Sequence, residues 1–230
     1  MYNLLACLLI FLGLAACQAT PPLVQRRAPL PAPAPSSQTT ERWSRLEQEI
    51  LILINGQRLM HQLLPLRPDP RLYRAALLHS REMTRLRRLT HQSRAGRDFS
   101  DRIKEQGYHW TRAGENVALE KTADPLAYLP ARVMFGTDNL TLIQSYCHQR
   151  GLPVPGGWQD VGLGWSGADW DHWKQVHGGN GGWMGSRGHR RNILLPEFTD
   201  TGIGHSGARD RDGSLYHYFT QDFAAGDSQP

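Results

Sequence analysis

The segment that most restricts the fold is the amphipathic stretch from Arg71 to Arg88, RLYRAALLHSREMTRLRR. One face repeats at helical spacing and opposes a charged face; it consists of Leu72, Ala75, Ala76, His79, Met83 and Leu86. Such a helix is stable only when its apolar face packs against another layer. Because His79 lies on that face, we expect a buried histidine that is hydrogen-bonded to a neighbour rather than a ligand.

Other patterns indicate what this helix packs against. An earlier helix is predicted from the spacing of Leu46, Ile50, Leu53 and Ile54, and a proline-rich connector separates the two helices. Near the C-terminus, TGIGHSG and LYHYFTQDF are typical of strands and are joined by the turn RDRDGS. We expect both helices to pack on these strands. Between them, Ser100 is expected to cap a short helix that ends at Gly107.

The N-terminus predicts export. The run LLACLLIFLGLAA ends in small residues before Cys17 and is too short to span a bilayer. The tetrapeptide Leu14-Ala15-Ala16-Cys17 resembles the bacterial lipobox, which implies that residues 1–16 are a signal peptide and that Cys17 is acylated. Gln18, in place of the Asp of inner-membrane retention, implies the outer membrane, facing the periplasm. An ordinary secretory signal and a short buried apolar segment remain alternatives, since the first three residues, MYN, include no Lys or Arg.

Residues 17–40 are rich in Pro, Ala, Ser and Thr and cannot form a core. We expect an extended tether; at roughly 3.1 Å per residue, Pro21 to Pro35 would reach on the order of 45 Å. With residues 1–16 removed and Cys17 acylated, Cys147 is the one remaining thiol, so an internal disulfide is excluded. We expect Cys147 to be buried or idle.

The net charge of +5 comes mainly from arginines spread along the chain. There is no dense basic run with interleaved aromatic residues, so nucleic acid is not an expected partner. A mildly basic surface suits anionic envelope polymers or lipid headgroups equally well.

Several short motifs occur in a defined order: NGQR, LLPLRPDPRL, AALLHSREM, Thr90-His91, DRIKEQGY, GENVA, WMGSRGHRRNIL, FTDTGIGHS and YHYFTQDF. This order resembles the CAP superfamily, or SCP domains, which includes cysteine-rich secretory proteins, antigen 5 and plant pathogenesis-related proteins. The resemblance implies an α+β fold, a three-layer α-β-α sandwich with a central, largely antiparallel sheet. It places the domain at residues 41–224, followed by a tail at 225–230.

The resemblance also implies a site. In the family, histidines and acidic residues face one another across a cleft, and the matching positions here are His91, Glu115 and His189. Two imidazoles and a carboxylate suit a divalent metal such as zinc, and the same groups can transfer protons. Arg190 and Arg191 are expected either to bind anionic groups at the rim or to be plain solvated charges.

Two departures from the family pattern qualify this site. Eukaryotic members have a second glutamate shortly after the tryptophan that matches Trp183, where this chain has Ser186 or Arg187, so metal affinity is in doubt. The second departure is an insertion at about residues 122–182 with four tryptophans, which form either its core, as we favour, or a wall for a sugar or lipid. Its segment DWDHWKQVH, with His172 and His177, offers a replacement ligand, although a structural role is favoured.

Three classes of function follow. The favoured one is a non-catalytic envelope binding module for a lipid, glycan or peptide. The second is a metal-dependent hydrolase that uses His91, Glu115 and His189, and the third is a protein-interaction domain with a vestigial cleft. No Ser or Cys stands in a recognisable nucleophile motif, which is why catalysis is not the favoured class.

The lipobox makes a direct prediction. Cys17→Ala removes the acylated sulfur, so the protein should move from the membrane to the soluble periplasmic fraction. Detergent-phase partitioning of wild type and variant measures this. Unchanged partitioning of the variant would argue against lipidation.

Overall fold

The computed structural model describes residues 43–177 and 181–226. The predicted signal peptide, Cys17, the tether and the last four residues of the tail lie outside the described residues. The helices are α1 Arg45–Met60, α2 Pro70–Leu86, α3 Phe99–Glu105, α4 Leu129–Phe135, α5 Leu140–Arg150, α6 Gly167–Val176, α7 Gly182–Gly185 and α8 Arg187–Ile193, and the strands are β1 Arg67–Pro68, β2 Arg112–Thr122, β3 Asp200–Arg209 and β4 Leu215–Ala225.

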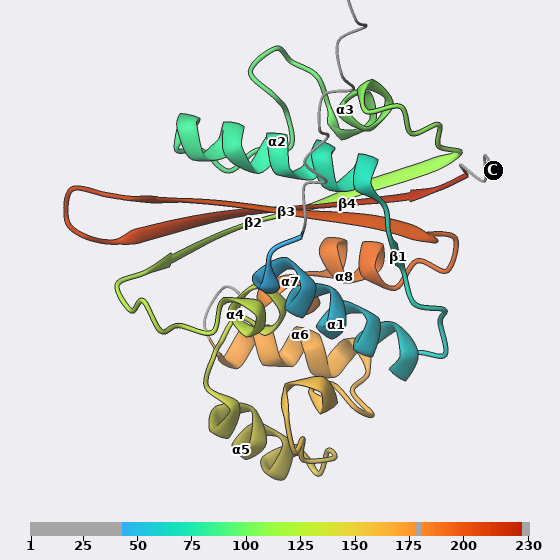
Figure 1. The fold of residues 1–230 in the computed structure, drawn as a ribbon. Coiled ribbons are helices and arrows are strands. Elements are labelled where there is room, and N and C mark those ends of the chain that lie inside the picture. The colour runs from blue at the N-terminus through green and yellow to red at the C-terminus, as the bar shows by residue number, and fades with distance from the viewer. Residues whose placement is uncertain (1–42, 178–180, 227–230) are drawn as a thin grey trace, which may run out of the picture. The chain divides into compact units, whose positions relative to one another are not determined.

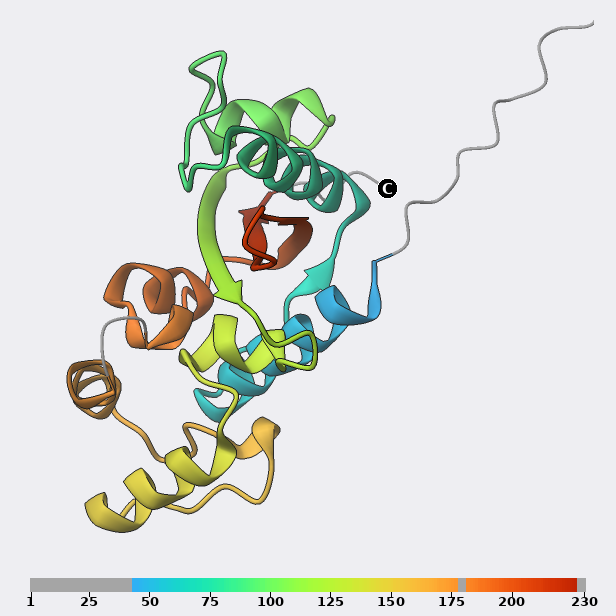
Figure 2. The ribbon, with the colours of Figure 1, turned by 90° about the vertical axis from the view of Figure 1, so that its left-hand side faces the viewer.

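The sheet has the order β1-β3-β4-β2, with β2 at one edge. β4 pairs antiparallel with both β2 and β3, and the short β1 pairs parallel with β3. Helices α2 and α3 cover one face, whereas α1, α4, α6, α7 and α8 lie on the other (Figures 1 and 2). The predicted α-β-α sandwich with a largely antiparallel sheet is confirmed.

Helix α2 is built as its sequence predicts. The Asp69 carboxylate accepts hydrogen bonds from the backbone N–H groups of Arg71 and Leu72, and Pro70 occupies the first turn, where it displaces no helical hydrogen bond. Its buried stripe packs on β3, where Gly202 and Gly204 let the helix approach closely. A Cβ atom at Gly202 would lie 2.0 Å from the Leu72 carbonyl carbon and from the Tyr73 nitrogen.

Two local predictions were wrong. The cap of α3 is Asp98, whose carboxylate accepts from the Asp101 N–H at 3.1 Å, while Ser100 lies inside the first turn and donates to Asp98. Leu86 is 38% exposed, so the apolar stripe of α2 ends at Met83. His79 is buried and its Nε2 lies 2.7 Å from the Thr90 carbonyl oxygen, as expected of a core histidine.

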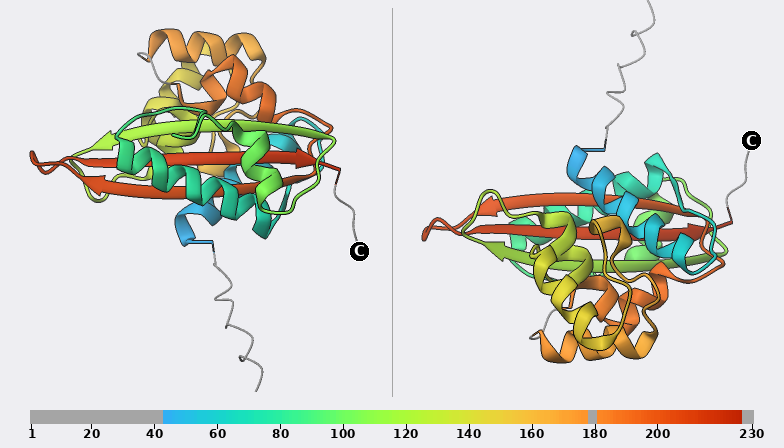
Figure 3. Two further views of the ribbon diagram at one scale, coloured as in Figure 1. Left: turned by 90° about the horizontal axis from the view of Figure 1, so that it is seen from above. Right: turned by 90° about the horizontal axis from the view of Figure 1, so that it is seen from below.

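The region 122–182 extends the core on the α1 side of the sheet. Trp165, Trp170 and Trp173 are buried in the same apolar cluster as α1 and Phe219 of β4, and Trp158 packs against this cluster while partly exposed. The view from below the sheet shows α4, α5 and α6 grouped beside α1 (Figure 3, right). These tryptophans therefore form core, as favoured. Cys147 is a buried free thiol in the same cluster.

The close contact between α2 and β3 leaves no room for a side chain at Gly202. Gly202→Ala places a methyl group against helix backbone that cannot rotate away, so the free energy of unfolding should fall by about 3 kcal/mol or more. Urea unfolding measures this. Gly188→Ala is the matched control, because no atom lies within 4 Å of the added Cβ. Equal stability of the two variants would show that α2 does not rest on Gly202.

Candidate functional site

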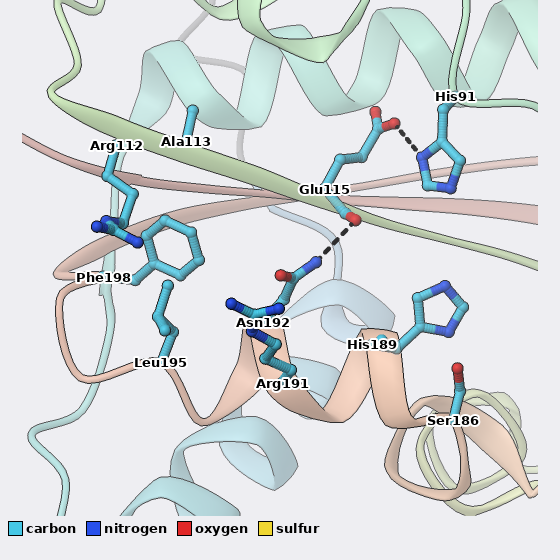
Figure 4. Close-up of a pocket in the computed structure, with 11 residues that line it drawn as sticks. His91, Arg112, Ala113, Glu115, Ser186, His189, Arg191, Asn192, Leu195 and Phe198 are labelled. Atoms are coloured by element: carbon cyan, nitrogen blue, oxygen red, sulfur yellow. Dashed lines mark hydrogen bonds and ion pairs between the residues drawn. The ribbon is translucent and has the colours of Figure 1, made fainter.

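Three separate elements bring the predicted site residues to one cleft of about 450 Å³. His91 lies in the segment after α2, Glu115 on the edge strand β2, and His189 on α8. Figure 4 shows the two imidazoles facing the cleft from opposite sides of β2, with Glu115 pointing toward His91. Arg112, Arg191 and Phe198 line the remainder of the cleft.

Glu115 is held from two directions. Its buried carboxylate accepts from the Arg102 guanidinium through Oε2, and its Oε1 lies 2.7 Å from His91 Nδ1. Arg102 also donates to the carbonyl oxygens of His91 and Arg97, at 3.0 and 3.3 Å. Both carboxylate oxygens are thus engaged, and the segment that carries His91 is tied to β2 through one buried arginine.

An amide pair fixes α8 against the edge of β2. Asn192 Nδ2 donates to the Glu115 carbonyl at 3.1 Å and to Asn116 Oδ1 at 3.0 Å. Asn116 Nδ2 in turn donates to the His189 carbonyl at 3.2 Å. These amides position His189 opposite His91. Sequence reasoning did not assign either one a role, although both stand inside the motifs GENVA and WMGSRGHRRNIL.

His189 is neutral near neutral pH. Burial lowers the pKa of its imidazole to about 4, and the nearby His91 and Lys174 act in the same direction. A neutral imidazole has one N–H donor and one lone pair, so His189 can hydrogen-bond a polar ligand or bind a metal.

Asp222 is a buried acid that sequence reasoning missed. It stands opposite Glu115 in the register of β2 and β4, its side chain is fully buried, and neither carboxyl oxygen has a hydrogen-bond partner among the described residues. Burial raises the pKa of Asp222 well above its usual range, and the charge on Glu115 raises it further, while Arg102 opposes the shift. These surroundings favour the protonated form of the Asp222 carboxyl group.

The two arginines of GHRRN have different roles. Arg190 is mostly buried, and it donates to the Met184 carbonyl at 2.6 Å and to Asp171 at 2.9 Å. Arg191 is exposed, lines the cleft and forms no ion pair with any described residue. Of the two expected rim residues, only Arg191 is placed to meet a ligand in the cleft.

The segment DWDHWKQVH has structural contacts. Asp169 caps α6 together with Ser166, and Asp171 pairs with Arg187 and Arg190, whose hydrogen bonds lower the pKa of Asp171 to about 2. His172 Nδ1 lies 3.2 Å from the Tyr146 hydroxyl, and the His177 ring lies tilted beside that of Trp173, with 3.8 Å between the ring centroids. None of these side chains lines the cleft, so the segment does not replace the family's second glutamate.

The donor set fits a metal only in part. Because Arg102 and His91 occupy the Glu115 oxygens, the carboxylate orients His91 rather than facing the cleft as a ligand. His91 Nε2 and a ring nitrogen of His189 remain as possible metal ligands. Within residues 43–177 and 181–226, no group of three or more His, Cys, Asp or Glu side chains is arranged to hold a metal ion.

The chain belongs to the CAP family. The model of this family, described as the cysteine-rich secretory protein family, matches residues 51–223. His91, Glu115 and His189 all lie within the matched residues. None of the curated proteins compared with the chain matches it. No described helix is both long and apolar enough to cross a bilayer.

Three solved structures illustrate the similarity. An extracellular SCP-domain protein from Bacillus anthracis is 22% identical with a TM-score of 0.47, covering 79% of this chain and 40% of its own. An outer surface protein from Borrelia burgdorferi is 14% identical with a TM-score of 0.45, and the match covers 80% of this chain and 96% of that protein. A cysteine-rich secretory protein from Staphylococcus aureus is 14% identical with a TM-score of 0.39, and the match covers 84% of this chain and 40% of that protein. The chain thus spans less than half the length of the first and third.

The protonated Asp222 predicts an unusual pH dependence. Its folded-state pKa is raised above the unfolded value near 3.9, so its contribution to stability is present below pH 4 and is lost as pH rises toward the folded pKa. Across that window, Asp222→Asn should gain stability relative to wild type by about 1.4 kcal/mol per pH unit.

Urea unfolding of wild type and Asp222→Asn at several pH values between 4 and 7 measures the difference. Asp160→Asn, which changes an exposed acid, is the control and should follow the wild-type curve. Parallel curves for wild type and Asp222→Asn would contradict the assignment of the proton to Asp222.

Proposed function

We propose that this CAP domain is a non-catalytic binding module, anchored through Cys17 to the outer membrane on its periplasmic side. Its ligand is an acidic glycan or peptide of the cell envelope, which binds in the cleft between His91 and His189. Among the three ligand classes expected from the sequence, the arginines and histidines that line the cleft favour these two over a lipid acyl chain. Ala113, Leu195 and Phe198 supply the main apolar surface, all toward the end of the cleft that holds Arg112 (Figure 4).

The observation that carries this proposal is the neutralisation of Glu115 by Arg102. Since that pair has no net charge, the arginines at the cleft, Arg112 and Arg191, determine the sign of the local field. Arg112 is only loosely paired, with its Nη2 3.8 Å from Glu197, and Arg191 is unpaired among the described residues. A cleft with excess positive charge and a neutral His189 that can donate its ring N–H suits carboxylate, sulfate or phosphate groups.

The same engagement argues against hydrolysis. A general base must be free to accept a proton from the attacking group, and both Glu115 oxygens are already bound to cationic or N–H donors. Ser186 also lines the cleft, but its hydroxyl makes no hydrogen bond to a histidine in the described part of the chain. The arrangement therefore supports recognition better than bond cleavage.

Binding can be tested with defined probes. Labelled hexaglutamate and hexagalacturonate should raise fluorescence anisotropy on binding, whereas hexaserine and maltohexaose should not. Arg191→Gln should weaken binding about ten-fold, which corresponds to the loss of one charge-assisted hydrogen bond.

Arg211→Gln is the control, since Arg211 is exposed in the β3–β4 turn and its substitution removes the same charge. The proposal predicts wild-type affinity for this control. Failure of the wild-type protein to bind either acidic probe, or an equal loss in both variants, would contradict it.

Metal binding is a second candidate, and the Glu115–His91 hydrogen bond is the observation that favours it. A carboxylate that orients a histidine in this way is common around bound zinc. We expect weak zinc binding that His91→Ala or His189→Ala abolishes and that Glu115→Gln weakens by about 10- to 100-fold. Calorimetric titration of chelator-treated protein measures this. Uptake that is unchanged in both histidine variants would place the metal elsewhere, and no uptake by wild type would exclude this candidate.

A further inference from the structure

The outward surface of α2 carries a continuous cationic stripe. Arg74, Leu78, Arg81 and Arg85 recur every three or four residues along α2 and are exposed, and the exposed Arg88 follows directly after the C-cap residue, Arg87. Seen from above the sheet, α2 and α3 are the outermost elements on this side (Figure 3, left). We call this stripe, with the neighbouring Leu86, Leu89 and Arg94, the α2 face.

Most of the positive charge on the α2 face is not neutralised. Arg74, Arg85, Arg88 and Arg94 form no ion pair with any residue in the described ranges, whereas nearby Arg87 pairs with Asp210 and Arg97 with Glu105. Two acids border the face: Glu105, which pairs with Arg97, and Glu82, whose carboxylate accepts from the Arg94 backbone N–H at 2.9 Å and lies 3.8 Å from His79. The surface thus has a clear excess of one sign.

Two hollows of about 220 Å³ each adjoin Arg85. One is lined by Glu82, Arg85, Leu86 and Arg94. The other is lined by Arg85, Arg97 and Leu78, and also by the carboxylates Glu82 and Glu105, so the first hollow has the clearer excess of positive charge. Each is large enough for a phosphate group, and each combines an arginine with an apolar rim. Arginine guanidinium groups bind phosphate oxygens in paired hydrogen bonds.

Leucines are exposed beside these arginines. Leu78 is 47% exposed, Leu86 38% and Leu89 44%, so apolar side chains are in contact with water beside the arginines. A helix face that alternates arginine with leucine suits an interface where phosphates and hydrocarbon are both present. A free anion would engage the arginines but leave the leucines in water.

We propose that the α2 face docks on the surface of an anionic phospholipid bilayer, with headgroup phosphates in the hollows beside Arg85 and with Leu78 and Leu86 at the acyl boundary. This contact uses a different surface from the cleft, which opens along β2. It orients the domain on a membrane independently of the ligand in the cleft and of any acyl chain on Cys17.

Vesicle co-sedimentation of the unlipidated chain from Gln18 to Pro230, which keeps every described element, tests the proposal. The chain should bind vesicles containing 30% phosphatidylglycerol and should not bind pure phosphatidylcholine. Arg85→Gln/Arg94→Gln should lower the partition coefficient roughly thirty-fold, from the attraction of about two basic residues to an anionic surface. Leu78→Ser/Leu86→Ser should also weaken binding, although it leaves the charge unchanged.

Arg45→Gln/Arg211→Gln is the control, because it removes the same charge from exposed arginines away from the α2 face. It should keep nearly wild-type binding. An equal loss in both arginine pairs would mean that net charge alone drives binding and would overturn the proposal. Unchanged binding by Leu78→Ser/Leu86→Ser, with displacement by millimolar inorganic phosphate, would indicate a simple anion site and also overturn it.

Discussion

The site depends on one buried ion pair, Arg102 with Glu115. The Glu115 side chain has no exposed surface and that of Arg102 is 6% exposed, so both charges are largely removed from water. Such a pair is tolerated best when further hydrogen bonds satisfy its atoms, and here His91 Nδ1 and two backbone carbonyls supply three of them, while Arg102 Nε has no partner among the described residues. Loss of either partner would leave an unpaired buried charge, at a cost of about 3–5 kcal/mol.

This pair also explains the charges around it. The Arg102 guanidinium donates to Glu115, whereas Asp222, opposite Glu115 on the adjacent strand, has no hydrogen-bond partner among the described residues, and burial raises its pKa well above the usual range. Glu115 is thereby neutralised and turned toward His91. The cleft keeps two imidazoles, Arg112, which is loosely paired with Glu197, and Arg191, which has no ion-pair partner among the described residues; this combination supports the anion binding that we propose.

The fold could be predicted from the sequence because its main signals are local. The stripe of α2, the strands around the turn RDRDGS and the order of the CAP motifs all lie within short windows. Sequence reasoning could not place the cap of α3, because Asp98 and Ser100 are both good caps and only tertiary contacts choose between them. Nor could it foresee that Leu86 would lie outside the core, because the helix turns that residue to solvent just before it ends.

The candidate residues of the cleft could be named from the sequence, but the contacts among them could not. His91, Glu115 and His189 stand in recognisable motifs, whereas the role of Arg102 depends on α3 packing over β2 and that of Asp222 on the register between β2 and β4. A pattern of residue types along one chain does not encode such cross-strand neighbours. Both Glu115 oxygens are hydrogen-bonded, one to Arg102 and one to His91. We therefore expect Glu115 to orient His91 rather than to bind a ligand itself.

The most direct test of this account is the tautomer of His91. Nitrogen-15 NMR at pH 8 should show the proton of the neutral His91 ring on Nδ1, donated to Glu115, and the lone pair on Nε2. In Arg102→Gln, the orientation of Glu115 should be lost and the two tautomers should mix. A wild-type His91 protonated on Nε2 would contradict the claim that the buried Arg102–Glu115 pair aims this imidazole at the cleft.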